Sequence, residues 1–337
     1  MTSSPELTDR VAAAPRRFIG MHIHSFSMRF HLAHLEGFDV FRYIDFARDE
    51  GFTGVNISAN GPGYRDLGGT TPAHFTSVRD HVRDRGLRLE LDTSDTRPEN
   101  MDRMLDVASA CGADTLRVYT KYVGAVRDLI EWTVRDLALA ARRAAAAGVL
   151  IVVENHEDFQ GEAIAEIVAR VDSPWVRALY DYGNSQMVGE DPLVALAAMG
   201  QWTSRVHLKD HVVLVDQRPD TTSERVVQGV PIGTGLLPII EQTRRLYDFG
   251  VRRFCFENVW GYVAPVTVPT INLPESRPFS MHHDHAFCDA RTLPVADAIE
   301  GELAAFRHGW DWLRTNLHAA GFEISPPASD GHIGRAD

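Results

Sequence analysis

Residues 148–156 read Gly148-Val149-Leu150-Ile151-Val152-Val153-Glu154-Asn155-His156. Five apolar and mostly β-branched residues lead directly into an acid, an amide and an imidazole. Because this apolar run follows an Ala-rich helical stretch and a glycine, it predicts a strand that is buried on both faces. Parallel α/β proteins place their chemistry at the carboxyl ends of such strands, so the polar cluster marks a candidate site.

The same pattern recurs along the chain and predicts the architecture. Eight apolar segments are each followed by a segment with helical spacing, and glycines or prolines separate the units. Eight consecutive strand–helix units are typical of the α/β class and predict a (β/α)8 TIM barrel. The predicted strands cover residues 18–24, 53–58, 87–92, 115–119, 149–154, 176–181, 204–209 and 252–257.

The main alternative fold is an open, doubly wound parallel sheet. That fold usually carries a glycine-rich fingerprint directly after its first strand. Here the first predicted strand ends in His24-Ser25-Phe26-Ser27, which contains no glycine. The sequence therefore favours the barrel.

The predicted barrel is a single domain, residues 17–322. Residues 1–16 are expected to form a flexible N-terminal arm, and residues 323–337, rich in Gly, Pro and Asp, a flexible tail. Two long segments, 211–231 and 259–294, are expected to be lid-like loops on the catalytic face.

Composition limits the classes of function. Of 337 residues, 44% are hydrophobic and 24% are charged, and the net charge of −12 argues against a nucleic-acid surface. The three cysteines are widely separated and show no disulfide framework. The N-terminal residues lack a secretion signal, and no apolar run approaches the roughly 20 residues that span a bilayer. We expect a cytoplasmic protein that binds neither nucleic acid nor membranes.

Four of the predicted strands end in a potential metal ligand. These residues are Glu154, Asp181, His207 and Glu257. In a barrel the carboxyl ends of neighbouring strands meet at one rim, where three carboxylates would repel one another without a positive charge. Three oxygen ligands and one imidazole suit Mn²⁺ best, with Mg²⁺ or Co²⁺ as alternatives.

Two histidines are candidates for substrate chemistry beside this metal site. His156 lies two residues beyond Glu154, so strand alternation places both on one side. It is a candidate general base, or a rim histidine bonded to a carboxylate. His24, at the end of the first strand, is a candidate substrate contact.

Further polar and aromatic residues are candidates for substrate binding. Lys209 could bind a substrate oxygen or form an ion pair with Asp210, and Asn184 could hold a hydroxyl group or stabilise a turn. The long segment 259–294 carries aromatic side chains that could form an apolar wall, and three closely spaced histidines of which one could reach the substrate. The aromatic residues are Trp260, Tyr262, Phe279 and Phe287, the histidines are His282, His283 and His285, and Trp260 and His285 are the preferred candidates.

An ordered set of short motifs resembles the xylose-isomerase-like superfamily of sugar isomerases and epimerases. The motifs are Val-Val-Glu154-Asn-His156, Asp181-Tyr-Gly-Asn184, Val-His207-Leu-Lys209-Asp210, Gly233-Thr-Gly235 and Phe-Glu257-Asn. The resemblance implies a metal ion held by Glu154, Asp181, His207 and Glu257. It also implies a reaction that begins with removal of a proton next to a carbonyl.

Within that superfamily the chain looks most like the large subunit of bacterial C-glycoside deglycosidases. This resemblance implies a lyase that cleaves the carbon–carbon bond of a 3-oxo-C-glycoside, with His156 as base, and a small companion subunit in an oligomer. The alternative is a ketose 3-epimerase or sugar isomerase, in which Glu154 and Glu257 are the paired acid and base. A non-catalytic sugar-binding barrel is a third interpretation. The superfamily also contains apurinic DNA endonucleases, which the negative charge disfavours.

Overall fold

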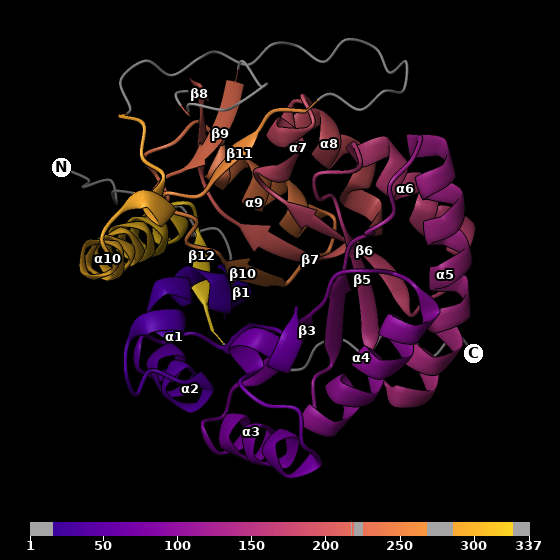
Figure 1. Cartoon of the computed structure of the whole chain (residues 1–337). Helices are drawn as coiled ribbons and strands as arrows, with labels where there is room; N and C mark the ends of the chain where they lie inside the picture. Colours follow the sequence, from indigo (N-terminus) through magenta and orange to yellow (C-terminus); the bar gives the residue numbers. More distant parts are fainter. Residues whose placement is uncertain (1–15, 217, 219–224, 268–285, 326–337) are drawn as a thin grey trace, which may run out of the picture.

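Eight parallel strands close into a barrel in the computed structural model, which describes residues 16–216, 218, 225–267 and 286–325. Neighbouring strands pair in chain order, and β10 pairs with β1 to close the ring (Figure 1). This confirms the predicted (β/α)8 barrel. The eight strands are β1 (Arg17–His24), β2 (Gly54–Ser58), β3 (Arg88–Asp92), β4 (Thr115–Val118), β5 (Leu150–Glu154), β6 (Val176–Asp181), β7 (Thr203–Leu208) and β10 (Arg253–Phe256).

Helices surround the barrel, and their ends carry the expected capping residues. Asp39 accepts hydrogen bonds from the amides of Phe41 and Arg42 at the start of its helix. Gly148 ends the helix that precedes β5. Its φ is 68°, a backbone conformation that would be strained in a residue with a side chain. The surrounding helices are α2 (Val40–Asp49), α3 (Pro72–Asp84), α4 (Pro98–Cys111), α5 (Val126–Ala147), α6 (Gly161–Val171), α8 (Pro192–Met199), α9 (Ile239–Asp248) and α10 (Val295–Ala319).

Short helical turns connect some of these units. Their geometry brings several site residues to the carboxyl ends of the strands, which we call the mouth of the barrel. The short elements are η1 (Ser25–Met28), α1 (Arg29–His34), η2 (Pro62–Leu67), α7 (Asn184–Met187), η3 (Gly200–Trp202) and η4 (Ala290–Thr292).

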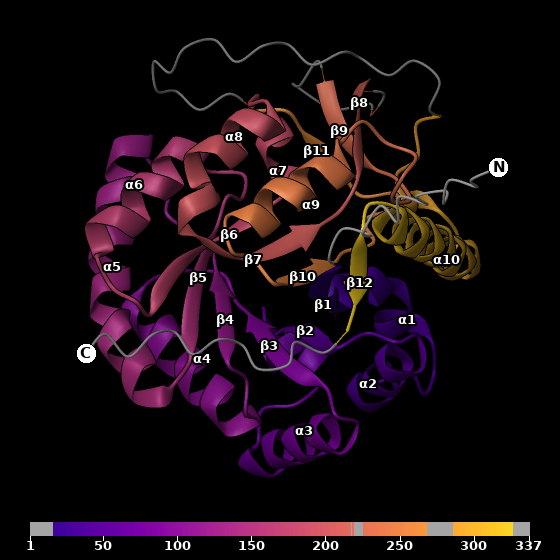
Figure 2. The same ribbon diagram turned by 180° about the vertical axis from the view of Figure 1, so that it is seen from behind.

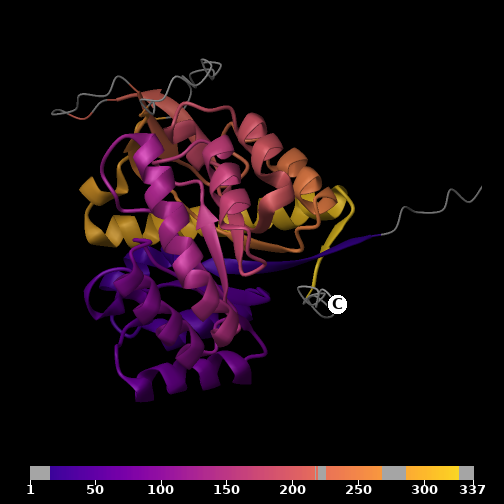
Figure 3. The same cartoon turned by 90° about the vertical axis from the view of Figure 1, so that its right-hand side faces the viewer.

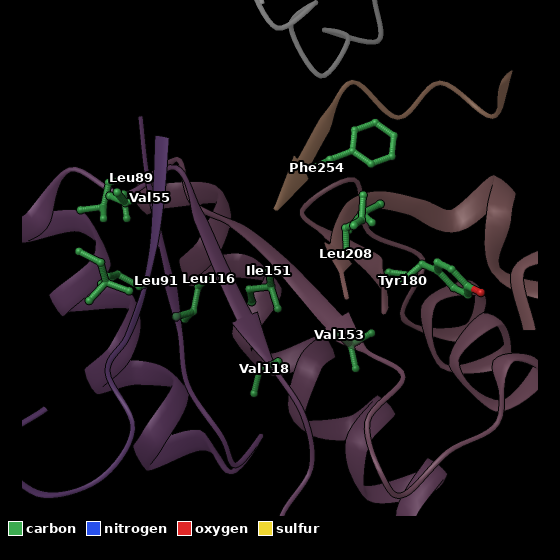
Figure 4. Close-up of a cluster of buried hydrophobic side chains, with 14 of the residues drawn as sticks. Val55, Leu89, Leu91, Leu116, Val118, Ile151, Val153, Tyr180, Leu208 and Phe254 are labelled. Atoms are coloured by element: carbon green, nitrogen blue, oxygen red, sulfur yellow. The ribbon is translucent and has the colours of Figure 1, made fainter. Parts of the chain in front are cut away.

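Successive side chains of each strand point in opposite directions, towards the helices or into the barrel. Outward-facing side chains such as Val55, Leu91 and Ile151 pack under the helices in the main hydrophobic core (Figure 4). Their neighbours along the strands point into the barrel, as strand geometry requires. Many of these inward residues are polar, and they build both the site and the layer beneath it.

A buried ion-pair network fills the barrel one layer below the mouth. Glu90 lies 3.0 Å from the Nε of Arg205 and 2.8 Å from the Nη1 of Arg253. Arg253 also binds Asp114 at 2.7 Å, and His22 lies 3.5 Å from Glu90. Burial lowers the pKa of His22 to about 4, so this ring is neutral at neutral pH. We call these five residues the floor network.

An aromatic cluster attaches α10 to the barrel. The ring of Trp310 stacks on Phe52 at a centroid distance of 4.2 Å, and its indole N–H donates to the carbonyl oxygen of Glu50. Phe256 and Phe306 pack edge-on against one another in the same cluster. Burial of these rings fixes the last helix across the junction between β10 and β1.

The two segments predicted as lid-like loops instead contribute a three-stranded antiparallel sheet. Its strands are β8 (His211–Val215), β9 (Arg225–Gly229) and β11 (Val263–Pro265), with β9 in the middle (Figure 1). Alternate valines point to opposite faces: Val212 and Val226 belong to one buried cluster, whereas Val213 and Val227 belong to another. Both faces are covered, which explains why a β-branched run replaces the expected loop.

The chain continues as a strand beyond the predicted barrel boundary. Residues 322–324 form β12 (Phe322–Ile324), which pairs with the start of β1 on the side away from the mouth (Figures 2 and 3). The expected tail therefore begins later than residue 323, because Phe322 is buried and the extended start of β1 offers a free edge. The expected arm, apart from Arg16, lies outside the described residues. Across the described ranges, no helix is both long and apolar enough to cross a membrane.

Candidate metal centre and active site

The four candidate metal ligands lie together at the mouth of the barrel. Glu154 and Asp181 are the last residues of β5 and β6, His207 is in β7, and Glu257 directly follows β10. All four are buried. Donor atoms of Glu154, Asp181 and His207 lie within 4.8 Å of one another, and so do those of His24, His207 and Glu257. The two groups share His207.

Two buried cations lie among these carboxylates, and each spans two of them. The guanidinium of Arg117 lies 2.9 Å from Glu154 and 3.3 Å from Asp92. The ammonium of Lys209 lies 2.8 Å from Asp181 and 3.1 Å from Glu257. We call these four acids and two cations the mouth charges. Two of the four negative charges remain uncompensated.

The pKa values at the mouth reflect this imbalance. Burial alone would raise the pKa of Glu154, but Arg117 and His207 hold it well below its usual range. Asp181 behaves differently. Burial, together with the nearby charges of Glu154 and Glu257, raises its pKa to about 6, although Lys209 acts in the opposite direction. Asp181 therefore takes up a proton at a higher pH than an ordinary aspartate, although it is mostly ionised at neutral pH.

The residues at the mouth fit a divalent cation. Glu154 Oε2, Asp181 Oδ2 and Glu257 Oε2 are buried carboxylate oxygens, and the contacts they make at 2.8–3.1 Å are with the cations Arg117 and Lys209. A dication would neutralise the two surplus negative charges and give these oxygens a ligand role. The mixture of carboxylates and imidazole suits a divalent transition metal or Mg²⁺.

His24 links this centre to Asp92. Its Nδ1 accepts a hydrogen bond from the amide of Phe26 at 2.9 Å, so the ring hydrogen lies on Nε2, which faces Asp92 at 3.5 Å. The ring also packs edge-on against His207 at 4.9 Å. His24 was predicted as a substrate contact, and the structure places it in the pocket wall beside the candidate ligands.

A pocket of about 340 Å³ opens directly above the candidate metal ligands. Its base is charged and includes Asp92, Arg117 and Lys209. The lining also includes five apolar or aromatic side chains, which we call the aromatic wall: Phe26, Tyr119, Met187, Val259 and Tyr262. Polar and charged residues such as Arg65, Asp66 and Glu157 make up much of the rest, and a concave site with convergent polar groups is typical of small-molecule binding.

The sequence profile described as "Xylose isomerase-like TIM barrel" matches residues 44–265, more than half of the chain. The chain belongs to this family. One curated relative, "Uncharacterized protein YihM" of Escherichia coli, is 23% identical over 214 residues, and the match covers 64% of each protein. The chain therefore matches somewhat less than two thirds of that relative's length.

Solved structures share the xylose isomerase-like fold at low sequence identity. A D-psicose 3-epimerase crystallised in the presence of D-fructose is 12% identical, with a TM-score of 0.60, over 90% of this chain and all of that one. The D-psicose 3-epimerase of Clostridium cellulolyticum H10 is 15% identical, with a TM-score of 0.58, over 89% and 99%. IolI, solved with a zinc atom, is 14% identical, with a TM-score of 0.57, over 85% and 96%.

In this xylose isomerase-like chain His156 lies beside the candidate metal ligands, and no acid among the residues that the structure describes forms an ion pair with it. Its ring stacks on Tyr119, with centroids 3.9 Å apart and planes 6° apart. Burial lowers the pKa of His156 to about 4, so the ring is neutral and can accept a proton at neutral pH. The hydrogen bond from its backbone amide to the carbonyl oxygen of Glu154 shows that the chain turns directly after β5.

Lys209 and Asn184 also line the pocket. The predicted alternative of an ion pair between Lys209 and Asp210 is wrong: Lys209 binds Asp181 and Glu257, whereas Asp210 accepts hydrogen bonds from backbone amides of the segment 233–237. The amide nitrogen of the Asn184 side chain is buried and has no hydrogen-bond partner among the described residues. Its contact with a substrate hydroxyl stays a prediction.

Trp260 does not line the pocket, contrary to the expectation for the aromatic wall. Its ring packs against Gly301 of α10, where a side chain would clash with it. Tyr262, another of the predicted aromatic residues, lines the pocket. Its hydroxyl donates to Glu157 at 2.9 Å, and its ring lies edge-on to Phe26 at 5.8 Å. His285, the other candidate in this segment, lies outside the described residues.

The sequence analysis singled out Lys209 but missed Arg117 and Tyr119. Arg117 lies within a strand pattern that gives no sign of its direction, and Tyr119, directly beyond β4, carries the same signal as the acids at the ends of later strands. Another signal was the distribution of lysines. The chain contains two, Lys121 and Lys209, among 34 lysines and arginines, and both line the pocket.

Proposed function

We propose that this chain is a divalent-metal-dependent enzyme that removes a proton from the carbon next to the carbonyl of a sugar, acting as a ketose 3-epimerase or isomerase. One observation carries the proposal: buried metal-binding groups and an excess of two negative charges lie at the base of a pocket large enough for a monosaccharide. The epimerases of the same fold support this choice of substrate class.

Glu154, Asp181, His207 and Glu257 would hold the ion. When bound, a divalent metal ion polarises a carbonyl or hydroxyl oxygen and stabilises the anion that forms when the neighbouring proton leaves. The oxygen-rich ligand set favours Mn²⁺, and a metal panel that includes Mg²⁺, Co²⁺ and Zn²⁺ would test this preference.

Two carboxylates are placed to move the proton. Glu154 ends β5 and Glu257 follows β10, and two strands separate them in the ring. They therefore reach the substrate from different sides of the mouth. One carboxylate can take the proton from one face of the carbon, and the other can return a proton to the opposite face, which inverts that centre. Arg117 and Lys209 keep both carboxylates ionised and thus able to accept a proton.

A second candidate function is the lyase reaction on a 3-oxo-C-glycoside. The aromatic wall of the pocket favours this reaction. Tyr119 and Tyr262 provide an apolar surface for a flat group attached to the sugar. In this reaction neutral His156 would take the C2 proton. The C1–aglycone bond would then break as a C1–C2 double bond forms, and the aglycone would leave with a proton.

Substrate-dependent exchange of solvent deuterium tests the first proposal. The Mn²⁺-loaded protein is incubated in deuterium oxide with D-psicose, D-tagatose or D-fructose, and the sugars are analysed by NMR. We expect deuterium at C3 and the formation of the C3 epimer. The Glu257→Gln variant is the matched control, since it loses one proton-transferring group. No exchange into any ketose would contradict the epimerase proposal.

A parallel incubation separates the two candidates. A 3-oxo-C-glycoside is supplied under the same conditions, and release of the aglycone is followed by chromatography. Aglycone release without exchange into ketoses would favour the lyase. In that case His156→Ala should abolish release while metal content, measured by mass spectrometry, stays unchanged. Loss of the metal in this variant would show that His156 is a ligand rather than a base.

A further inference from the structure

Lys209 lies between the two groups of candidate metal ligands. Asp181 belongs to one group and Glu257 to the other, and the ammonium is 2.8 Å from the first and 3.1 Å from the second. The side chain is 7% exposed, so water screens these ion pairs poorly. Lys209 thus makes the contacts with both acids that a metal ion bound by all four residues would make.

The ammonium and a metal ion would compete for the same oxygens of both acids, Asp181 Oδ2 and Glu257 Oε2. Carboxylate oxygens bind divalent ions such as Mg²⁺ or Zn²⁺ at about 2.0–2.2 Å. Asp181 and Glu257 would therefore have to approach one another more closely than two hydrogen bonds to an intervening ammonium allow. A dication placed there would also repel the charge of Lys209.

We propose that Lys209 is a placeholder cation, which bridges Asp181 and Glu257 in the metal-free protein and leaves this bridge when a divalent ion binds. This inference rests on the metal-dependent function proposed above. Its consequences are a metal-free site that stays folded and a metal affinity that is weaker than the acids alone would give. After displacement, the ammonium remains at the pocket that its side chain lines and faces the substrate.

The choice of lysine supports a movable cation. Lysine carries a compact charge on a flexible stem, whereas arginine holds a rigid planar fork that favours fixed, two-pronged pairing. The chain uses arginine for the permanent pairs of the floor network and for Arg117. One of its two lysines lies where the ligand groups must rearrange, and the other, Lys121, is exposed at the pocket rim.

Metal affinity provides the main test. Wild type, Lys209→Met and Lys121→Met are stripped of metal, and Mn²⁺ and Zn²⁺ binding is measured by isothermal titration calorimetry. We expect Lys209→Met to bind both ions at least about tenfold more tightly, because a neighbouring like charge is gone. Lys121→Met should match the wild type. Equal or weaker binding by Lys209→Met would overturn the proposal.

The melting temperature of the same proteins gives a second readout. Without metal, Lys209→Met should melt at a lower temperature than wild type, and saturating metal should raise its melting temperature by more. A variant that folds only with metal also supports the proposal, whereas an unchanged melting temperature without metal contradicts it.

Biosynthetic labelling with 13Cε-lysine covers the case in which the variant cannot be produced. The wild-type spectrum then contains one Cε signal from each lysine. On saturation with diamagnetic Zn²⁺, relaxation measurements should show greater mobility for the Lys209 methylene group and no change for Lys121. An equally immobile Lys209 in the metal-loaded protein would rule out displacement.

The calorimetry also separates this inference from the proposed function. If wild type binds divalent ions and Lys209→Met binds them no more tightly, only the placeholder role fails. If neither protein binds a divalent ion, the metal-dependent function fails as well.

Discussion

The floor network and the mouth charges are adjacent layers of one barrel with opposite electrostatic balance. In the floor network, Arg205 and Arg253 match the charges of Glu90 and Asp114. At the mouth, Arg117 and Lys209 face four carboxylates. Even if His24, whose pKa Asp92 raises against the effect of burial, is protonated, the mouth stays negative. A balanced layer supports the fold, whereas a deficient one can recruit a cation.

The largest expected effect is on activity at the mouth. Glu257→Gln removes a candidate ligand and proton-transferring group, so we expect deuterium exchange into the substrate to fall by about 1,000-fold or more. Because the mouth has surplus negative charge, the free energy of unfolding of the metal-free variant should change by less than about 1 kcal/mol. Exchange kinetics and urea denaturation measure the two quantities. A variant that keeps a tenth of the activity would remove Glu257 from the mechanism.

The next effect is on stability at the floor. Arg253→Met removes a buried partner of Glu90 and Asp114, which keep Arg205 and Arg88 respectively, and breaking such a buried pair costs up to about 3–5 kcal/mol. Urea denaturation should show this loss, while the metal affinity of the folded protein stays near that of wild type. If the free energy of unfolding falls by less than about 1 kcal/mol, the ion pairs of the floor network do not support the fold as proposed.

Glu190 lies outside both layers and sharpens the comparison, because no ion pair with a cation joins it in the described part of the chain. Glu190 is buried and accepts a hydrogen bond from the amide of Gly161 at 2.9 Å. Burial, with the nearby charge of Glu162, raises its pKa to about 7, whereas that hydrogen bond lowers it. Between pH 4.5 and about 7, Glu190 therefore keeps its proton in the folded state, whereas the unfolded chain has released it. This contribution to stability is complete below pH 4.5 and is lost as the pH rises through about 7.

Glu190→Gln should remove this pH dependence. Between pH 5 and 8 the wild type should lose about 2 kcal/mol more than the variant in its free energy of unfolding. Urea denaturation at several pH values measures the difference. Parallel curves for the two proteins would show that Glu190 ionises normally.

The smallest effect concerns the pocket wall. Tyr262→Phe removes the hydrogen bond to Glu157, so we expect a loss of stability of at most about 1 kcal/mol and a KM that rises a few-fold. Trp260→Phe is the matched control, since Trp260 packs on α10 outside the pocket, and its KM should stay unchanged. A larger KM effect from Trp260 would restore it to the substrate site.

The sequence predicts the barrel well because its signals are local. Apolar runs such as 149–153 and capping residues such as Asp39 act within a few residues of themselves. The strand-end acids could be grouped because barrel topology brings strand ends together. Pairing between distant segments is harder to predict from sequence. The sequence predicts a loop over 211–231, although His211–Val215 is rich in valine and pairs with β9.

The cations of the site were harder to predict than its acids. A strand arginine such as Arg117 can point to solvent, to the core or to the mouth, and only the register of β4 decides. The partner of Lys209 also depended on geometry, because Asp210 is its neighbour in sequence but turns towards the amides of the segment 233–237. Trp260 and Tyr262 show the same limit. They are two positions apart in the sequence, yet Tyr262 lines the pocket and Trp260 packs against α10.

The pairing of β12 with the start of β1 has a practical consequence. Arg17 and Phe322 are partners in that pairing, so the first and last strands of the described residues lie side by side at the end of the barrel opposite the mouth. A surface tether or a fused protein attached at this end of the barrel would extend away from the opening. Immobilised in this way, the barrel would present its open end to passing solute.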